Sequence, residues 1–249
     1  MEAKTKKKML TGLFVLFVLT TLFTFLFAND RRRENIAFAR QIAEITPRGG
    51  TPRTVEDLRR AISLYEAQIN RHVRDGAQTG AFWRILGVRL ADAGMHRDAV
   101  AAFEGALRFD AADPMVFYLK GISAAIVGAS IVDPAGQDER ERFLRLAENS
   151  HRRALELDDM YLRPMYALGV LYAFDLDSPE LAIPLLVNYL SFMPNDIQAM
   201  FVLARAFVMT GEFDSALYLY GRIISSSNDA AIRRDAQMNR EIVWGILDG

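Results

Sequence analysis

The sequence predicts an all-helical protein, in which one N-terminal transmembrane helix precedes a solenoid of helix-turn-helix repeats. Two observations support this prediction. Residues 9–28 form an uncharged stretch, and about 20 helical residues span the roughly 30 Å hydrocarbon core of a bilayer. After this stretch, a pattern of small and aromatic residues at helical spacing occurs four times between residues 80 and 227, which is typical of stacked helical repeats.

Composition excludes several classes of function. The chain has 249 residues, of which 51% are hydrophobic, so it can bury a core. Its formal net charge is −1, which gives no field that would attract nucleic acid, and we expect no nucleic-acid partner. Cysteine is absent, which excludes disulfides, thiolate metal sites and a thiol nucleophile.

The N-terminal segment has two interpretations. Residues 1–8 form a basic tail with four lysines, and residues 9–28 are either an uncleaved anchor or a signal peptide cleaved after Ala28. The apolar run exceeds the roughly 7 to 15 residues of a signal peptide, and Leu26 stands where a small residue is expected. We therefore expect a single-pass membrane anchor. The alternative is a secreted or periplasmic factor that acts as a chaperone or assembly subunit.

Orientation depends on the basic residues on both sides of the anchor. Four lysines precede it, and an arginine triplet at residues 31–33 follows it together with Arg40. The positive-inside rule counts both groups, so the balance is close. We expect the short tail to stay inside the cell and the repeat domain to lie on the extracytoplasmic side, although the arginine triplet argues against this orientation.

Residues 29–53 link the anchor to the repeats. Apolar residues at helical spacing predict a juxtamembrane helix over residues 31–45, and residues 47–52 (PRGGTP) then form a Pro/Gly hinge. Thr54 and Asp57 stand three residues apart, as in a capping box, and predict that a new helix begins there.

The first repeat shows its motif most clearly, as one helix with Trp, Leu and Gly and a second with Ala and Phe: Trp83-x2-Leu86-Gly87-x2-Leu90, then Ala99-x3-Phe103-x2-Ala106. This pattern resembles the signature of the tetratricopeptide-repeat (TPR) family. Gly87 and Ala99 are twelve residues apart, as are Ala204 and Ala216, so the first and fourth repeats share one register. The resemblance implies a right-handed superhelical solenoid, in which each repeat contributes a helix A and a helix B.

The resemblance covers residues 54–249, beginning with a half repeat at residues 54–79 whose helix is expected to end near Arg74. Four repeats and a capping helix follow, with these expected boundaries: about 80–113, 114–161, 162–196 and 197–227 for the repeats, and 228–247 for the capping helix. Gly94 and Gly211 fall in turns between helix A and helix B, where glycine accepts a positive φ.

The second repeat contains an insertion. Gly121 and Ala147 are 26 residues apart where twelve are expected, which places about fourteen extra residues at 128–141. Pro134 and Gly136 lie within this stretch, so we expect a surface loop followed by an early start of helix B.

Catalytic and metal-binding constellations are absent from the sequence. The three histidines, His72, His96 and His151, do not pair at metal-ligand spacing, and each is expected to be a surface or packed imidazole. No Gly-rich phosphate loop or Gly-x-Ser-x-Gly turn is present, and the insertion has neither the pattern of a calcium loop nor a nucleophile with a base. We expect no enzyme activity, no cofactor and no metal.

The resemblance implies that the concave face is lined mainly by helix A of each repeat. Carrying the family's positions onto this sequence predicts a groove of aromatic, aliphatic and arginine side chains, formed by Arg84, Tyr118, Ile122, Arg163, Tyr166, Phe174, Phe201 and Arg205, with Val88, Ile126, Val170 and Met209 beside them. Such residues are concentrated at protein-binding hot spots. The alternative is that they form ordinary inter-helix core or are covered by the terminal helix.

One type of partner does not fit. TPR domains that grip the C-terminal carboxylate of chaperones use Lys, Arg and Asn at set groove positions, whereas this sequence has Val88, Leu119 and Ala167 at such places. We therefore expect no chaperone carboxylate clamp. The expected function is a membrane-anchored scaffold or adaptor that binds a protein or peptide through its concave groove.

Overall fold

The computed structural model of the chain describes residue 33, residues 35–46 and residues 54–248, and the regular elements of these residues are all helical. They fall into two compact units, divided between Asp75 and Gly76, and each unit is described by itself. In these described residues, no helix combines the length and the apolar character needed to span a membrane. The expected anchor at residues 9–28 lies outside them, as do the basic tail and the hinge.

The first unit consists of a short helix at residues 35–45 and the first part of α2 (Val55–Asp92). The expected helix start at Thr54 is confirmed, and the hydroxyl of Thr54 accepts a hydrogen bond of 3.0 Å from the backbone N–H of Asp57. The carboxylate of Asp57 accepts from this hydroxyl at 2.7 Å, so one half of the expected capping box is present. The two helices contact each other through Phe38 and Tyr65, whose rings meet edge to face with centroids 5.3 Å apart.

The sequence predicted that the helix beginning at Val55 ends near Arg74, and this prediction is wrong for α2. The helix continues without a break to Asp92, so the half repeat of residues 54–79 and helix A of the first repeat form one helix of 38 residues. The physical reason is that residues 75–80 (DGAQTG) contain no proline to interrupt the helical hydrogen bonds. Gly80 has a packing role instead, since a Cβ at this position would lie 2.9 Å from the Cβ of Phe109.

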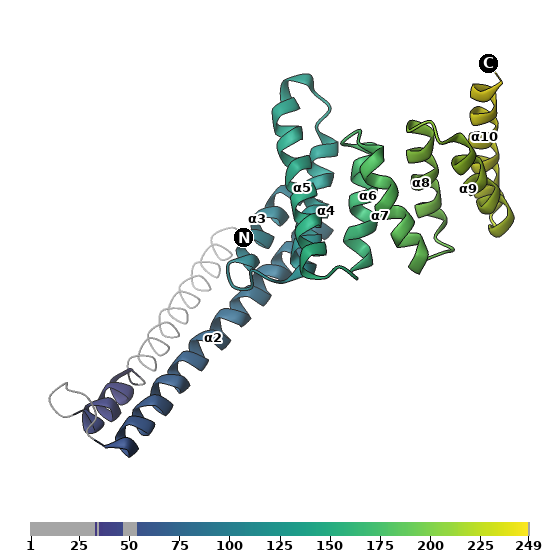
Figure 1. Cartoon of the computed structure of the whole chain (residues 1–249). Coiled ribbons are helices and arrows are strands. Elements are labelled where there is room, and N and C mark those ends of the chain that lie inside the picture. Colours follow the sequence, from purple (N-terminus) through teal and green to yellow (C-terminus); the bar gives the residue numbers. More distant parts are fainter. Residues whose placement is uncertain (1–32, 34, 47–53, 249) are drawn as a thin grey trace, which may run out of the picture. The chain divides into compact units, whose positions relative to one another are not determined.

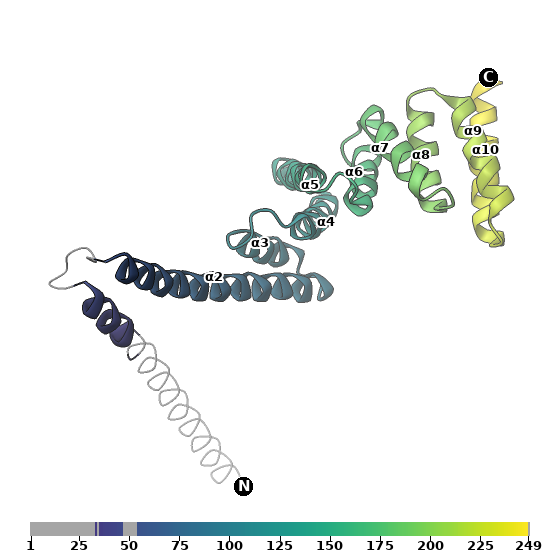
Figure 2. The same ribbon diagram turned by 60° about the horizontal axis from the view of Figure 1, so that its bottom comes forward.

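The second unit, residues 76–248 as described, begins with the last part of α2 and continues as a series of helices joined by short turns. These are α3 (His96–Leu107), α4 (Pro114–Ser130), α5 (Gln137–Leu157), α6 (Leu162–Phe174), α7 (Pro179–Phe192), α8 (Ile197–Met209), α9 (Phe213–Ser226) and α10 (Ala230–Leu247). Consecutive helices pack side by side, as Figure 1 shows for α6 with α7 and Figure 2 for α9 with α10. In addition, α4 contacts α6 and α6 contacts α8. Helices A therefore adjoin one another, as in a TPR array.

The register of the repeats follows from close contacts between helix A and helix B. A Cβ at Gly87 would lie 2.5 Å from the ring of Phe103, and a Cβ at Gly169 would lie 2.7 Å from Leu186. Small residues thus let the two helices approach closely at the positions that the family motif predicts. The larger partner stands four residues after the alanine of helix B each time, which makes His151 the equivalent of Phe103 and Leu186.

The turns between helix A and helix B require a left-handed backbone. Gly94 has φ +75° and Gly211 has φ +78°, which confirms the expectation from the sequence. In the third repeat Asp177 takes this role with φ 47°, and it is the one non-glycine residue with positive φ in the described part of the chain. Aspartate tolerates this conformation better than most residues, but less well than glycine.

The insertion at residues 128–141 mostly lengthens helices. Helix α4 continues to Ser130, and α5 already begins at Gln137 after a 3-10 turn at Pro134–Gly136. The early start of helix B was expected, whereas the surface loop is shorter than expected. Arg140 fastens the base of this hairpin, because its guanidinium donates to the carbonyl of Gly128 at 3.1 Å and lies 3.5 Å from Asp175.

Three helices of the second unit, α4, α8 and α10, begin with an aspartate cap. Asp113 accepts from the backbone N–H of Met115 and Val116 at the start of α4, Asp196 caps α8, and Asp229 caps α10. Each side chain satisfies N–H groups that have no partner within the helix. The starting points of α4, α8 and α10 are therefore fixed locally, and with them the positions of the side chains along each helix.

Candidate functional site

Three of the predicted groove residues, Phe174, Phe201 and Arg205, lie together in one cavity of about 460 Å³. The cavity is formed by the end of α6, one face of α8, one residue of α9 and one face of α10. Its remaining lining residues are Gln198, Val202, Val208, Met209, Tyr220, Asn239, Ile242 and Val243. This set, here called the α8/α10 groove, is mostly apolar with a few polar groups, as is usual for ligand-binding clefts.

Arg205 has a fixed position at the rim of the α8/α10 groove. Its guanidinium carbon lies 4.6 Å from the ring centroid of Phe174, within the range of a cation–π contact. Its Nε donates a hydrogen bond of 3.3 Å to the carbonyl of Ala173, the residue before Phe174. The terminal nitrogen atoms of Arg205 take no part in this bond, and the residue is exposed.

The floor of the groove is aromatic. The rings of Phe201 and Tyr220 have centroids 6.2 Å apart, and Tyr220 is only 5% exposed. Burial raises the pKa of the Tyr220 phenol above its ordinary value of 10.0. The phenol is therefore neutral at physiological pH and can act as a hydrogen-bond donor or acceptor, but not as a base.

The far wall of the groove comes from α10. Ile242 is 57% exposed and Val243 is buried, so one turn of the helix offers both an open apolar side chain and a packed one. These two residues were not among those predicted to line the groove. The apolar stripe of α10 is evident in the sequence and indicates a capping helix. The sequence of one helix does not show which of its apolar residues a neighbouring helix covers and which stay open.

Met209, predicted to lie beside the groove residues, also lines this groove, whereas the other predicted residues are dispersed and do not. Tyr118 and Tyr166 are half-buried. The ring centroids of Tyr118 and Tyr161 are 5.6 Å apart, and those of Tyr166 and Tyr189 are 5.3 Å apart. Ile122 is also half-buried and Arg163 is exposed. Tyr118 and Tyr166 thus contribute partly to inter-helix packing within their repeats, one of the two alternatives that the sequence left open.

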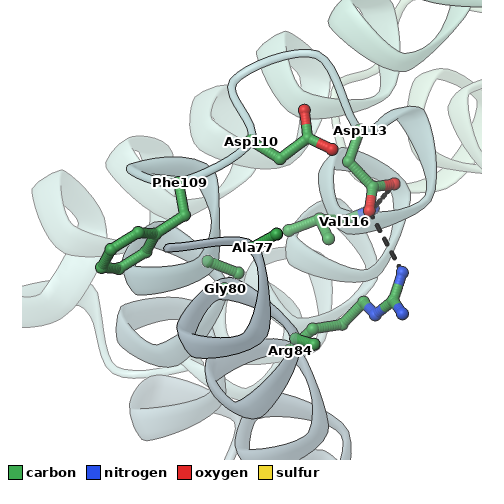
Figure 3. Close-up of a pocket in the computed structure, with 9 residues that line it drawn as sticks. Ala77, Gly80, Arg84, Phe109, Asp110, Asp113 and Val116 are labelled. Atoms are coloured by element: carbon green, nitrogen blue, oxygen red, sulfur yellow. Dashed lines mark hydrogen bonds and ion pairs between the residues drawn. The ribbon is translucent and has the colours of Figure 1, made fainter. Parts of the chain in front are cut away.

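Arg84 lines a different cavity, of about 260 Å³, between the last part of α2, the end of α3 and the start of α4. Figure 3 shows its guanidinium directed at Asp113, with Nη1 3.2 Å from Oδ2. Asp113 is already the N-cap of α4, so its carboxylate has partners on both sides. This ion pair fastens α4 to α2 and leaves Arg84 less available to a partner than Arg205.

The three histidines, His72, His96 and His151, lie on three different helices, α2, α3 and α5. Among the residues that the structure describes, no group of His, Asp and Glu is arranged to hold a metal ion. His151 is 1% exposed, and burial lowers its pKa from 6.5 to about 4, so it is a neutral core residue. His72 is exposed beside Gln68.

Solved structures of TPR proteins resemble this chain. YrrB, a TPR protein with an unusual peptide-binding site, matches with a TM-score of 0.57 at 18% identity over 72% of this chain and 83% of YrrB. MamA from Desulfovibrio magneticus RS-1 gives a TM-score of 0.54 at 16% identity over 67% and 92% of the two chains. TTC0263 from Thermus thermophilus gives 0.51 at 15% identity over 76% and 92%.

At these identities the similarities establish the fold. No protein-family model and no curated protein matches the sequence. The similarity to the solved TPR structures confirms the expected helical repeat architecture.

Proposed function

On the premise that its helical array has the tetratricopeptide-repeat fold, we propose that this protein is a membrane-anchored scaffold or adaptor that binds a protein partner in the α8/α10 groove. The observation that carries the proposal is the meeting of Phe174, Phe201 and Arg205 in one cavity with Tyr220 and Ile242. Aromatic and arginine side chains around an apolar cleft are the composition of binding hot spots.

The groove suggests the chemistry of its partner. Phe174 is 53% exposed and Ile242 is 57% exposed, and both stand at the rim of an apolar cleft. Arg205 is held beside them by Phe174 and the carbonyl of Ala173. We therefore expect a peptide segment with one or two large apolar side chains and an acidic group next to them. YrrB, a similar structure, is a TPR protein with a peptide-binding site, which supports a peptide as the occupant.

No catalytic role belongs to this proposal. The charged side chain at the groove rim is an arginine, and Tyr220 is a neutral phenol whose pKa is raised by burial. Neither is suited to proton transfer near pH 7, whereas both suit recognition. Binding without chemistry is the function that these residues support best.

A photo-crosslinking amino acid placed in the full-length protein tests the groove assignment. Inserted at Ile242 or Met209, it should form a covalent product with the partner in the cells that express the protein. Tyr218 is the matched control, because it is 67% exposed on α9 and does not line the groove. Products of equal yield from Tyr218 and from the groove positions would contradict the assignment.

The membrane anchor is the second part of the proposal. It is supported by the uncharged stretch at residues 9–28, which exceeds the length of a signal-peptide core. Intact mass spectrometry of the mature protein is the test. A mass that includes residues 1–28, found in a membrane fraction that resists carbonate extraction, supports the anchor, whereas a mass that begins near Asn29 supports the cleaved, secreted or periplasmic alternative. Protease accessibility in intact and permeabilised cells tests the proposed extracytoplasmic orientation.

A further inference from the structure

A row of large apolar side chains is exposed along the first part of α2. Its members, here called the α2 stripe, are between 44% and 66% exposed: Val55, Leu58, Ile62, Tyr65, Ile69 and Val73. The first five of these residues alternate in steps of three and four, which is the spacing of positions a and d in helices that pair with another helix. Soluble surfaces rarely expose contiguous apolar rows of this length without a partner.

The two edges of the α2 stripe differ. On one edge Ala61 is only 8% exposed, and Tyr65 meets Phe38 of the short helix at residues 35–45. This edge is therefore already covered by the same chain. In the heptad pattern of the stripe, Val55, Ile62 and Ile69 take position a, and Leu58 and Tyr65 take position d. On the other edge, Arg59 directly follows Leu58 and Glu66 directly follows Tyr65, and both charged side chains are exposed. The open surface thus consists of the stripe and a margin with one positive and one negative charge.

From this arrangement we infer that two copies of this chain pair through the α2 stripe as antiparallel helices. A twofold axis between Ser63 and Leu64 would place Leu58 of one copy against Ile69 of the other, and Ile62 against Tyr65. The same alignment brings Arg59 of each copy next to Glu66 of the other. Both residues stand at the heptad position after d, and this position lies opposite its counterpart in an antiparallel pair.

Charge complementarity favours a second copy as the occupant. A twofold interface must be complementary to itself, and the margin of the α2 stripe meets this condition, since one antiparallel register pairs Arg59 with Glu66 twice. A parallel alignment places Arg59 beside Thr54 and Glu66 beside Ala61, and thus makes no ion pair. Exposed ion pairs add little affinity, but they select orientation and register.

Disulfide formation in the full-length protein tests this pairing, because the chain has no cysteine of its own. Leu58→Cys and Ile69→Cys variants with different tags are co-expressed and oxidised. The antiparallel pair predicts a disulfide between the two variants. Neither variant alone should cross-link, because each residue lies about 16 Å along the axis from its own copy, eleven residues at about 1.5 Å, whereas a disulfide requires Cα atoms within about 7 Å.

Ala67→Cys is the matched control, because Ala67 is exposed on the opposite side of α2. It should not cross-link in any combination. Cross-linking of Leu58→Cys with itself would show a parallel pair and overturn the inference, as would the absence of a product between the two variants.

Charge exchange provides a second, independent readout. Arg59→Glu should weaken dimerisation roughly tenfold in light-scattering measurements, because it turns two attractive pairs into two repulsive ones. The double variant Arg59→Glu/Glu66→Arg should restore it. A particle mass of one chain for the unmodified protein would overturn the inference and leave the α8/α10 groove untouched, because the groove is formed by other residues.

Discussion

The imidazole of His151 fills the space that a side chain at Gly121 would need: a Cβ on Gly121 would lie 2.5 Å from Cε1 and 2.7 Å from Nδ1 of the ring. His151 thereby packs against the glycine of helix A in the second repeat, as Phe103 packs against Gly87 in the first and Leu186 against Gly169 in the third. It also touches the ring of Tyr118, with centroids 5.9 Å apart. The packing of α4 on α5 therefore also positions Tyr118, one of the predicted groove residues.

Replacing Gly121 by alanine should lower the free energy of unfolding by about 1 to 3 kcal/mol, because the ring of His151 is rigid and cannot make room without moving α5. Gly221→Ala is the matched control, since Gly221 lies in α9 and a Cβ there has no neighbour within 4 Å. That variant should gain up to about 1 kcal/mol from helix propensity. Urea denaturation measures both, and equal effects would refute the close-packing account.

The stability of the protein should depend on pH through His151. Burial lowers the pKa of His151 from 6.5 to about 4, so the unfolded chain takes up a proton at a higher pH than the folded protein does. The stabilisation is complete above about pH 6.5 and is lost as the pH falls toward about 4, by up to about 3 kcal/mol. Other groups titrate too, so the comparison is with His151→Leu, which introduces the residue type that the third repeat has at Leu186.

Urea midpoints at about pH 7.5, 6 and 5 check this expectation. The unmodified protein should lose stability relative to His151→Leu as the pH falls. A difference between the two proteins that stays constant over this range would show that His151 is not the group responsible.

Asp177 offers a stabilising substitution. Its φ of 47° is strained for a residue with a Cβ, whereas Gly94 and Gly211 hold the equivalent turns at no such cost. Asp177→Gly should therefore raise the free energy of unfolding by about 0.5 to 1 kcal/mol, and Gly211→Ala should lower it by about 1 kcal/mol. Thermal melts of the two variants should shift in opposite directions. Shifts of the same sign would contradict this explanation.

Asp113 should matter more for stability than its partner Arg84. Loss of Asp113 in an Asp113→Ala variant removes the cap bonds to Met115 at 2.9 Å and Val116 at 3.1 Å, which costs about 1 to 2 kcal/mol. Arg84→Met removes only the ion pair of a side chain that is 40% exposed, which costs about 0.5 kcal/mol or less. Equal losses in denaturation experiments would mean that the ion pair, not the cap, dominates.

The features that the sequence predicted well are those where geometry restricts the residue type. Close approach of two helices requires a small residue at Gly87, Gly121 and Gly169, and the positive φ of a turn favours glycine at 94 and 211. Such positions can be found in a single sequence because few other residues satisfy them. They determine the repeat register and therefore the fold.

The features that the sequence missed depend on what surrounds a helix. Nothing near Arg74 distinguishes a helix end from a continuation, because Gly76 and Gly80 are compatible with both. Phe201 and Arg205 stand one turn apart on α8 and could be placed on one face, but their enclosure by Ile242 of α10 depends on how the last helices pack. Tyr118 and Tyr166 fit the family's groove positions, yet their ring partners come from outside their own helices.

The affinity of the α8/α10 groove for its cross-linked partner segment tests the central claim most directly. Isothermal titration would compare the unmodified protein with Phe174→Ala, Arg205→Ala and the control Tyr218→Ala, after their thermal melts show intact folds. We expect each groove substitution to weaken binding about tenfold or more, about 1.4 kcal/mol, with the effect of Arg205→Ala shrinking at high salt, and Tyr218→Ala to bind normally. Unchanged affinity in both groove variants would contradict the account.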